Sequence, residues 1–208
     1  MKPTVRHLGV ALALLGMSAA TQAASLNFVD DFAPQVGSWS VSTSYNNHDG
    51  GILGQLADGS ATLTLDSPGA GSALLAFDLL GFRTVDGVNC CTDVFTLSIN
   101  GTAILSGSFD MGGGGTNVVY FEPDGTTITP GGGVRHIALG IDLVAGPNTL
   151  MFNYGSMQGF GDEAWGLDNV SVTAANLTAP VPEPGTWAML AAGLGLLGLG
   201  VHRRRHTA

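Results

Sequence analysis

Apolar and polar residues alternate over short segments along most of this chain. Phe95, Leu97 and Ile99 are separated by polar residues and are followed by Asn100-Gly101. A period of two is typical of a strand with one buried face. Asn-Gly favours a type I′ turn, because both central residues of that turn take positive φ. These residues therefore predict a β-hairpin over 93–109.

Similar apolar segments recur at short intervals, separated by Gly, Asn, Asp and Pro, and no stretch sustains a helical period. The other predicted strands are 26–32, 38–44, 61–65, 73–77, 118–121, 134–142, 149–154 and 165–173. About ten short strands favour an all-β fold, a two-sheet antiparallel sandwich that resembles a jelly roll. The glycine runs 112–115 and 131–133 lack the lysine of a phosphate-binding loop, so we interpret them as flexible linkers between strands.

The N-terminal residues 1–23 have the pattern of a signal peptide. Lys2 and Arg6 precede an apolar core over 8–17 and a stretch of small residues. We expect signal peptidase to cut after Ala23, or alternatively after Ala24. The core is too short to span a membrane permanently, so the pattern indicates export.

The last residues, 180–208, form a second targeting segment. It contains, in order, the triplet Pro182, Glu183 and Pro184, an uncharged apolar run over 186–201, and the arginines Arg203, Arg204 and Arg205. Arginine resists crossing the hydrocarbon, so an apolar run closed by arginines predicts a transmembrane helix at about 186–201 with a cytoplasmic end. The run is short for a spanning helix and rich in glycine, which suggests a temporary anchor.

The order of these three parts resembles the PEP-CTERM sorting signal of exported proteins in Gram-negative bacteria. The same tail resembles a segment called an ice-binding protein C-terminal domain, a label that implies no activity for this chain. The resemblance implies an exosortase as partner, which cuts near Pro-Glu-Pro and transfers the body of the protein to the cell envelope or the exopolysaccharide matrix. The alternative is a plain C-terminal membrane anchor.

The body between the two segments, 24–179, has the length of one domain. It contains fifteen carboxylates but only two basic residues, Arg83 and Arg135, so its net charge is −13 against −9 for the whole chain. Such a surface repels nucleic acid and anionic lipid and attracts divalent cations. We therefore expect no nucleic-acid partner.

The two cysteines, Cys90 and Cys91, are adjacent in sequence. Export favours disulfides, although neighbouring residues can close only a strained ring. Three states remain open: a vicinal disulfide, which the turn-like context favours, an intermolecular bridge, or two free thiols. A zinc site is disfavoured, because separated cysteine pairs and a histidine cluster are both missing.

The stretch Trp-Gly-Leu-Asp-Asn-Val that begins at Trp165 resembles the closing strand of carbohydrate-binding-module-like and concanavalin-like sandwiches. In a regular strand Asp168 shares a face with Val170 and Val172, while Trp165 and Leu167 occupy the other face. If the valines point inward, Asp168 is carried toward the core, where an unpaired carboxylate is costly.

A structural calcium ion would compensate this carboxylate. We expect Asp168 to bind it together with Asp162 or Glu163, and with Asp31 if the first and last strands lie side by side. In the alternative, Asp168 or Asn169 caps a bulge by hydrogen bonding to nearby backbone amides.

Carbohydrate binding usually requires exposed aromatic rings beside polar groups. The polar, glycine-flanked loop 45–51 is the better candidate, with Tyr45, Asn47 and His48 as ligand-binding residues. A second cluster comprises Tyr154, Phe160 and Trp165. Trp39 and Trp165 lie in predicted strands, where aromatic residues are more often part of the core.

Catalysis finds little support in the sequence, and we expect no enzyme. No Gly-x-Ser-x-Gly elbow is present, and His48 and His136 have no nucleophile beside them in the sequence. The function predicted is an exported, exosortase-sorted envelope or exopolysaccharide-matrix protein with a non-catalytic carbohydrate-binding-like module. The alternatives are a purely structural matrix or adhesion protein and, less favoured, a glycoside hydrolase. The exposure of Trp39, Tyr45, Tyr154 and Trp165 distinguishes a binding module from a structural one.

Overall fold

The computed structural model describes residues 23–42, 44–47, 50–180, 185 and 188–196. The signal peptide predicted over 1–23, the triplet 182–184 and the arginines 203–205 therefore lie outside the described residues, apart from Ala23. Residues 22–182 form one compact unit. Residues 188–196 are helical, and no helix within the described ranges combines the length and the apolar character that a membrane crossing requires.

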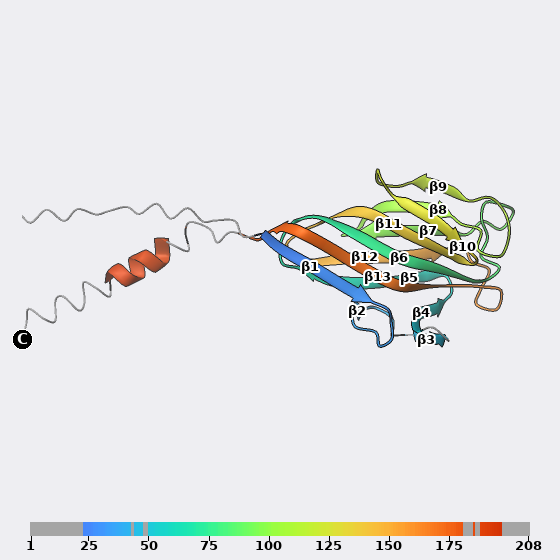
Figure 1. The fold of residues 1–208 in the computed structure, drawn as a ribbon, viewed down its shortest axis with the longest axis horizontal. Helices are drawn as coiled ribbons and strands as arrows, with labels where there is room; N and C mark the ends of the chain where they lie inside the picture. Colours follow the sequence, from blue (N-terminus) through green and yellow to red (C-terminus); the bar gives the residue numbers. More distant parts are fainter. Residues whose placement is uncertain (1–22, 43, 48–49, 181–184, 186–187, 197–208) are drawn as a thin grey trace, which may run out of the picture. The chain divides into compact units, whose positions relative to one another are not determined.

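Two antiparallel sheets stack face to face in this unit (Figure 1). The first sheet has the order β10 (Thr127–Gly131), β11 (Val134–Leu143), β6 (Gly71–Arg83), β13 (Glu163–Thr178), β4 (Gly50–Leu56) and β3 (Ser44–Asn47), with β1 (Ala23–Asp30) also paired to β13. The second has the order β2 (Ser38–Trp39), β5 (Gly59–Ser67), β12 (Gly146–Gly155), β7 (Val94–Ile99), β8 (Thr102–Ser108) and β9 (Val118–Phe121). The predicted two-sheet antiparallel sandwich is confirmed.

The core lies between the sheets and is rich in aromatic rings. Phe77 of β6 meets Phe152 of β12 edge to face, with ring centroids 5.1 Å apart. Phe95 of β7 packs on Tyr154 at 5.7 Å, and Tyr154 on Trp165 at 6.1 Å. All five side chains are at most 2% exposed, because each occupies an inward position of an alternating strand.

The predicted hairpin is confirmed in detail. β7 and β8 pair on either side of Asn100 and Gly101, whose φ values of 50° and 83° are those of a type I′ turn. Three strands escaped prediction, namely β3, β4 and β10, and the predicted strand 38–44 is limited to β2 at 38–39. β4 begins with two glycines, and β10 carries Pro130 at the edge of its sheet, where a missing N–H is tolerated.

A bulge changes the alternation predicted for β13. Between Asp168 and Ser171 the pairing of β13 with β6 shifts register, and Asn169 takes a φ of 50°. Both Trp165 and Val170 are consequently buried, whereas Asp168 is only half-buried. The bulge therefore turns Trp165 and Leu167, as well as the two valines, toward the core. The prediction that Asp168 shares the inward face of the valines was wrong.

The glycine runs lie at connections between strands, where several of their backbone groups make defined contacts. Gly132 and Gly133 close the hairpin of β10 and β11, since Gly131 pairs directly with Val134. In the run 112–115, the N–H groups of Gly112 and Gly114 donate to Asp110 Oδ1 at 3.1 and 2.9 Å. These glycines fix loop geometry at the end of the sandwich.

Asp30 organises the segment between β1 and β2. Its side chain is 1% exposed and accepts hydrogen bonds from three backbone N–H groups, those of Phe32, Val36 and Gly37, and from the indole Nε1 of Trp39, all at 2.9 to 3.1 Å. Hydrogen bonds to a buried carboxylate are stronger than those between neutral groups. The loop thus takes its shape from one carboxylate.

We expect Asp30→Ala to lower the free energy of unfolding by about 3 kcal/mol or more, because four N–H donors lose a buried charged acceptor. Asp31→Ala is the matched control, since Asp31 is exposed and accepts one hydrogen bond, from the N–H of Ala33. It should change stability by less than about 1 kcal/mol. Urea unfolding followed by tryptophan fluorescence measures both, and equal effects would contradict this role for Asp30.

Candidate cation site

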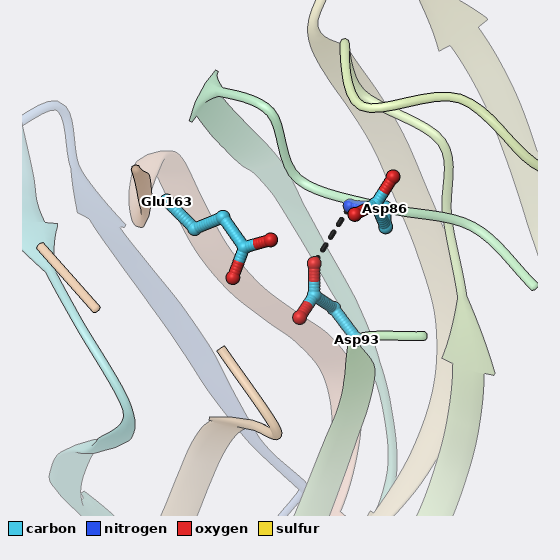
Figure 2. A group of neighbouring side chains, drawn as sticks. All are labelled: Asp86, Asp93 and Glu163. Carbon is cyan, nitrogen blue, oxygen red and sulfur yellow. Dashed lines mark hydrogen bonds between the residues drawn. The ribbon is translucent and has the colours of Figure 1, made fainter. Parts of the chain in front are cut away.

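Three carboxylates meet at the end of the sandwich where β6 finishes and β13 begins. Glu163, the first residue of β13, pairs with Arg83, the last residue of β6. The segment after β6 then supplies Asp86 and, directly before β7, Asp93. One oxygen from each side chain lies within 4.8 Å of the others. Figure 2 shows the carboxylate of Glu163 extended toward Asp93, with Asp86 beside them.

The cluster is buried and only partly hydrogen-bonded. Asp93 and Glu163 are 0% exposed and Asp86 is 6% exposed. The N–H of Asp86 donates to Asp93 Oδ2 at 2.6 Å, and the N–H of Gln158 donates to Glu163 Oε2. Asp93 Oδ1 and Glu163 Oε1 have no partner. Among the described residues, the other buried side-chain polar atom without a partner is the hydroxyl of Tyr154.

Burial and nearby negative charges raise the pKa values of Asp93 and Glu163. Burial raises the pKa of Asp93 to about 6, against the lowering effect of the Asp86 N–H bond, and the charges of Glu163 and Asp86 add to the rise. Burial also raises the pKa of Glu163, with the nearby charges of Asp86, Asp162 and Asp58 acting in the same direction. Burial raises the pKa of Tyr154, and the charge of Asp93 adds to this. Negative charge is therefore costly here unless something compensates it.

No basic side chain compensates the cluster within the described ranges, where the one ion pair joins His136 to Asp78. Arg135 is buried, but its guanidinium donates to uncharged oxygens, those of Val134, Asp110 and the Asn117 side chain. Arg83 donates to the carbonyl of Gly161. The carboxylates thus lack an internal counter-charge.

The glycine run 112–115 encloses the cluster. A Cβ on Gly113 would overlap the carbonyl oxygen of Thr84 and Asp86 Oδ1, so only glycine permits this approach. The N–H of Gly87 donates to the carbonyl of Gly114 at 2.9 Å and ties the two loops together. Enclosed carboxylate oxygens are suited to holding a hard cation.

The structure brings one of the four predicted metal ligands, Glu163, into this cluster. Asp162 lies next to it, but its side chain is exposed and accepts a hydrogen bond from Thr84 Oγ1 at 3.1 Å. Asp168 stands opposite Asp78, five residues along β13 from Glu163, or about 16 Å at the rise of a strand. One ion therefore cannot bind both Glu163 and Asp168.

Asp168 and Asp31 lie near each other, as the side-by-side pairing of β1 with β13 predicts. Burial raises the pKa of Asp168, and the charges of Asp78 and Asp31 contribute. Asp168 Oδ1 accepts the N–H of Asn169 at 2.7 Å within the bulge, the arrangement given above as the alternative to a calcium ligand. Asp31 is exposed, and its Oδ1 accepts the N–H of Ala33.

Sequence reasoning missed Asp86 and Asp93. A signal for Asp93 exists, since two-residue alternation places it on the same face as Phe95, Leu97 and Ile99, all of which are buried. Asp86 lies in an irregular segment, where no periodicity identifies its direction.

The predicted ligand-binding aromatic residues are mostly buried. Tyr154 and Trp165 are 0% exposed, and Trp39 is half-buried against Phe32 and Phe152. The predicted loop 45–51 is largely a hairpin, because Tyr45 and Asn47 belong to β3 and pair with β4. His48 lies outside the described residues.

Cys90 and Cys91 lie in the turn between Asp86 and Asp93. Their Sγ atoms are 3.1 Å apart, and both are thiols in this structure. A hydrogen bond with Cys90 raises the pKa of the Cys91 thiol, while one with the Gln158 side chain lowers it. The sulfurs are close enough for a disulfide to form by a small movement, and that disulfide stays a prediction.

Comparison with known proteins identifies the tail. Residues 180–205 match the PEP-CTERM protein-sorting motif. No curated protein matches the chain. The chain therefore carries the sorting motif that its Pro-Glu-Pro triplet and terminal arginines predicted.

Solved structures resemble the body of the chain at low identity. A family 35 carbohydrate-binding module from Cellvibrio japonicus Abf62 is 17% identical, with a TM-score of 0.45 over 76% of this chain and 100% of that one. A family 35 module from an environmental isolate is 13% identical, with a TM-score of 0.43 over 75% and 99%. Dimeric latent PorU from Porphyromonas gingivalis is 14% identical, with a TM-score of 0.42 over 77% of this chain and 14% of that one. These likenesses concern the fold alone.

The raised pKa of Asp93 predicts a pH-dependent stability in chelator. Because its folded pKa of about 6 exceeds the unfolded value of 3.8, Asp93 binds protons better in the folded state. Its contribution to stability is complete below pH 3.8 and is lost as the pH rises through about 6. Urea unfolding between pH 4 and 8 should show this fall, and Asp93→Asn should reduce it. Asp124→Asn, in an exposed turn, is the control, and an equal reduction there would contradict the assignment to Asp93.

Proposed function

We propose that this chain is an exported protein that an exosortase sorts into the cell envelope or exopolysaccharide matrix, where its β-sandwich acts as a non-catalytic carbohydrate-binding module. The observation that carries the proposal is the PEP-CTERM protein-sorting motif at 180–205. The body is a single compact unit, which suits a module that is released from its tail and works alone.

Exposed aromatic rings on the edge strand β9 support a role in binding. Tyr120 and Phe121 are 49% and 47% exposed, and the hydroxyl of Tyr120 is within 2.8 Å of Ser108 Oγ, which fixes the ring. Rings with one apolar surface and a polar group are suited to pack against sugars. By the exposure criterion given above, the burial of Tyr154 and Trp165 favours the structural alternative. The candidate platform is instead the edge strand that carries the exposed Tyr120 and Phe121, here called the β9 surface.

The burial of the acidic cluster argues against hydrolysis at that place. Glycoside hydrolases need two carboxylates on either side of an accessible bond. Asp93 and Glu163 are 0% exposed, so no sugar reaches them in this structure. The proposed role therefore involves binding without bond cleavage.

Processing of the tail tests the sorting proposal. In a host with an exosortase, the mature protein should lose everything from about Gly185 onward, because the Pro-Glu-Pro triplet precedes the membrane segment that holds the chain for cutting. Intact-mass measurement distinguishes this form from the full tail. The variant Pro182→Ala/Pro184→Ala, or a host without exosortase, should keep the tail. A mature wild-type protein that retains Arg203–Arg205 would refute sorting.

The β9 surface gives a second test. Affinity electrophoresis in gels that contain the host's purified exopolysaccharide should retard the protein. Tyr120→Ala/Phe121→Ala should weaken this binding by roughly three- to tenfold, the amount expected from a lost aromatic contact. Val119→Ala, an exposed position on the same strand, is the control. Absence of retardation for the wild type would favour the purely structural matrix protein.

A further inference from the structure

We propose that Asp86, Asp93 and Glu163 bind one calcium ion, which joins the two sheets of the sandwich where β6 ends and β7 and β13 begin. This inference does not depend on what the module binds or on how its tail is processed. It rests on the charge, the free oxygens and the positions of three side chains.

The negative charge of this cluster has no counter-charge within the described part of the domain. Three buried carboxylates lie within reach of one another, and neither arginine of the domain pairs with any of them. Asp58 and Asp162 increase the negative potential at Glu163. Buried charges in proteins are normally paired or coordinate a metal. A divalent cation would balance the negative charge of these carboxylates.

Buried oxygens without a hydrogen-bond partner gather at this cluster. Every buried side-chain polar atom that the described residues leave without a partner belongs to Asp93, Glu163 or Tyr154. Two of these three atoms, Asp93 Oδ1 and Glu163 Oε1, belong to the cluster itself. Unpartnered buried atoms are rare in folded proteins and require an explanation. Their gathering at one place points to a ligand there.

The spacing of the carboxylate oxygens fits one calcium ion. Oxygens on opposite sides of a calcium ion are separated by about 4.6 to 5.2 Å, twice a ligand distance of 2.3 to 2.6 Å. The nearest oxygens of the three carboxylates lie within 4.8 Å of one another, so a single ion can contact all three. The backbone N–H groups of Asp86 and Gln158 already hold Asp93 and Glu163 by one oxygen each. The second oxygen of each is free to bind the ion.

The ligand set selects the kind of cation. The group consists of carboxylates without histidine or cysteine, which favours hard cations over zinc or copper. Magnesium prefers an ideal octahedron and retains several waters, whereas this cluster is at most 6% exposed and irregular. Calcium accepts irregular oxygen coordination and loses its water more readily.

The position of the site assigns a mechanical role to the ion. Glu163 begins β13 in one sheet, while Asp93 directly precedes β7 in the other. Asp86 lies beside them, in the segment between β6 and β7 that contacts the glycine run 112–115. An ion held by all three residues therefore connects both sheets and fixes the segment between β6 and β7.

The experiment uses the full-length protein in mild detergent, first treated with chelator and then titrated with calcium chloride in a calorimeter. We expect one ion bound per chain and a rise in melting temperature of about 5 °C or more at a hundredfold excess over Kd. Glu163→Gln and Asp93→Asn should each weaken calcium binding at least about tenfold. In chelator both variants should melt at or above the wild-type temperature, because a repulsive charge is gone. A variant that is less stable than the wild type in calcium, but at least as stable in chelator, has lost a ligand and is not misfolded.

Asp168→Asn is the matched control, since Asp168 is a half-buried carboxylate on the same strand but outside the cluster. It should bind calcium like the wild type. Loss of binding in Asp168→Asn, with Glu163→Gln unaffected, would overturn the site. A wild type that binds no divalent cation would overturn the proposal. Equal stabilisation by magnesium or sodium chloride would indicate screening of the acidic surface. None of these outcomes alters the tests of sorting or of the β9 surface.

Discussion

The pairing of β13 is the constraint on which the rest of this sandwich depends. One edge of β13 pairs with β6 from Glu163 to Thr173, and the other is shared by β1 and β4. The bulge between Asp168 and Ser171 turns Trp165, Leu167, Val170 and Val172 all into the core, which a regular strand cannot do. The same pairing places Glu163 against the end of β6. The core and the acidic cluster therefore both follow from one strand.

The domain has a net charge of −13 and few internal counter-charges, so each buried carboxylate needs some other compensation. Most carboxylates remain at the surface, and Asp30 is satisfied by hydrogen bonds from backbone and indole N–H groups. Asp93 and Glu163 have one such donor each, which leaves half of each carboxylate free. The contrast between Asp30 and this pair is the physical basis for expecting a cation at one place and not at the other.

The glycine-rich composition has a structural reason that differs from flexibility. Gly113 permits the close approach of two loops over Asp86, and Gly132 and Gly133 close a tight hairpin. At Gly113 the backbone approach leaves no room for a side chain, whereas at Gly133 a φ of 79° favours glycine. The loops at this end of the sandwich are thus packed against one another, and they shield the carboxylates from solvent and from any large substrate.

The sequence by itself determined the fold class, the strands with clear alternation, the hairpin at Asn100-Gly101 and the sorting motif of the tail. These features depend on local patterns, because strand periodicity, turn geometry and a linear motif are all read from neighbouring residues. It also indicated that an acidic domain binds a cation and that Glu163 contributes, which stays a proposal. Only the tertiary structure gathered Asp86, Asp93 and Glu163, since their proximity arises from pairing between β6 and β13, strands about eighty residues apart. Only the structure, too, located the bulge that moves Asp168 away from the core, because a bulge depends on the register of the partner strand and leaves no clear trace in the alternation of one strand.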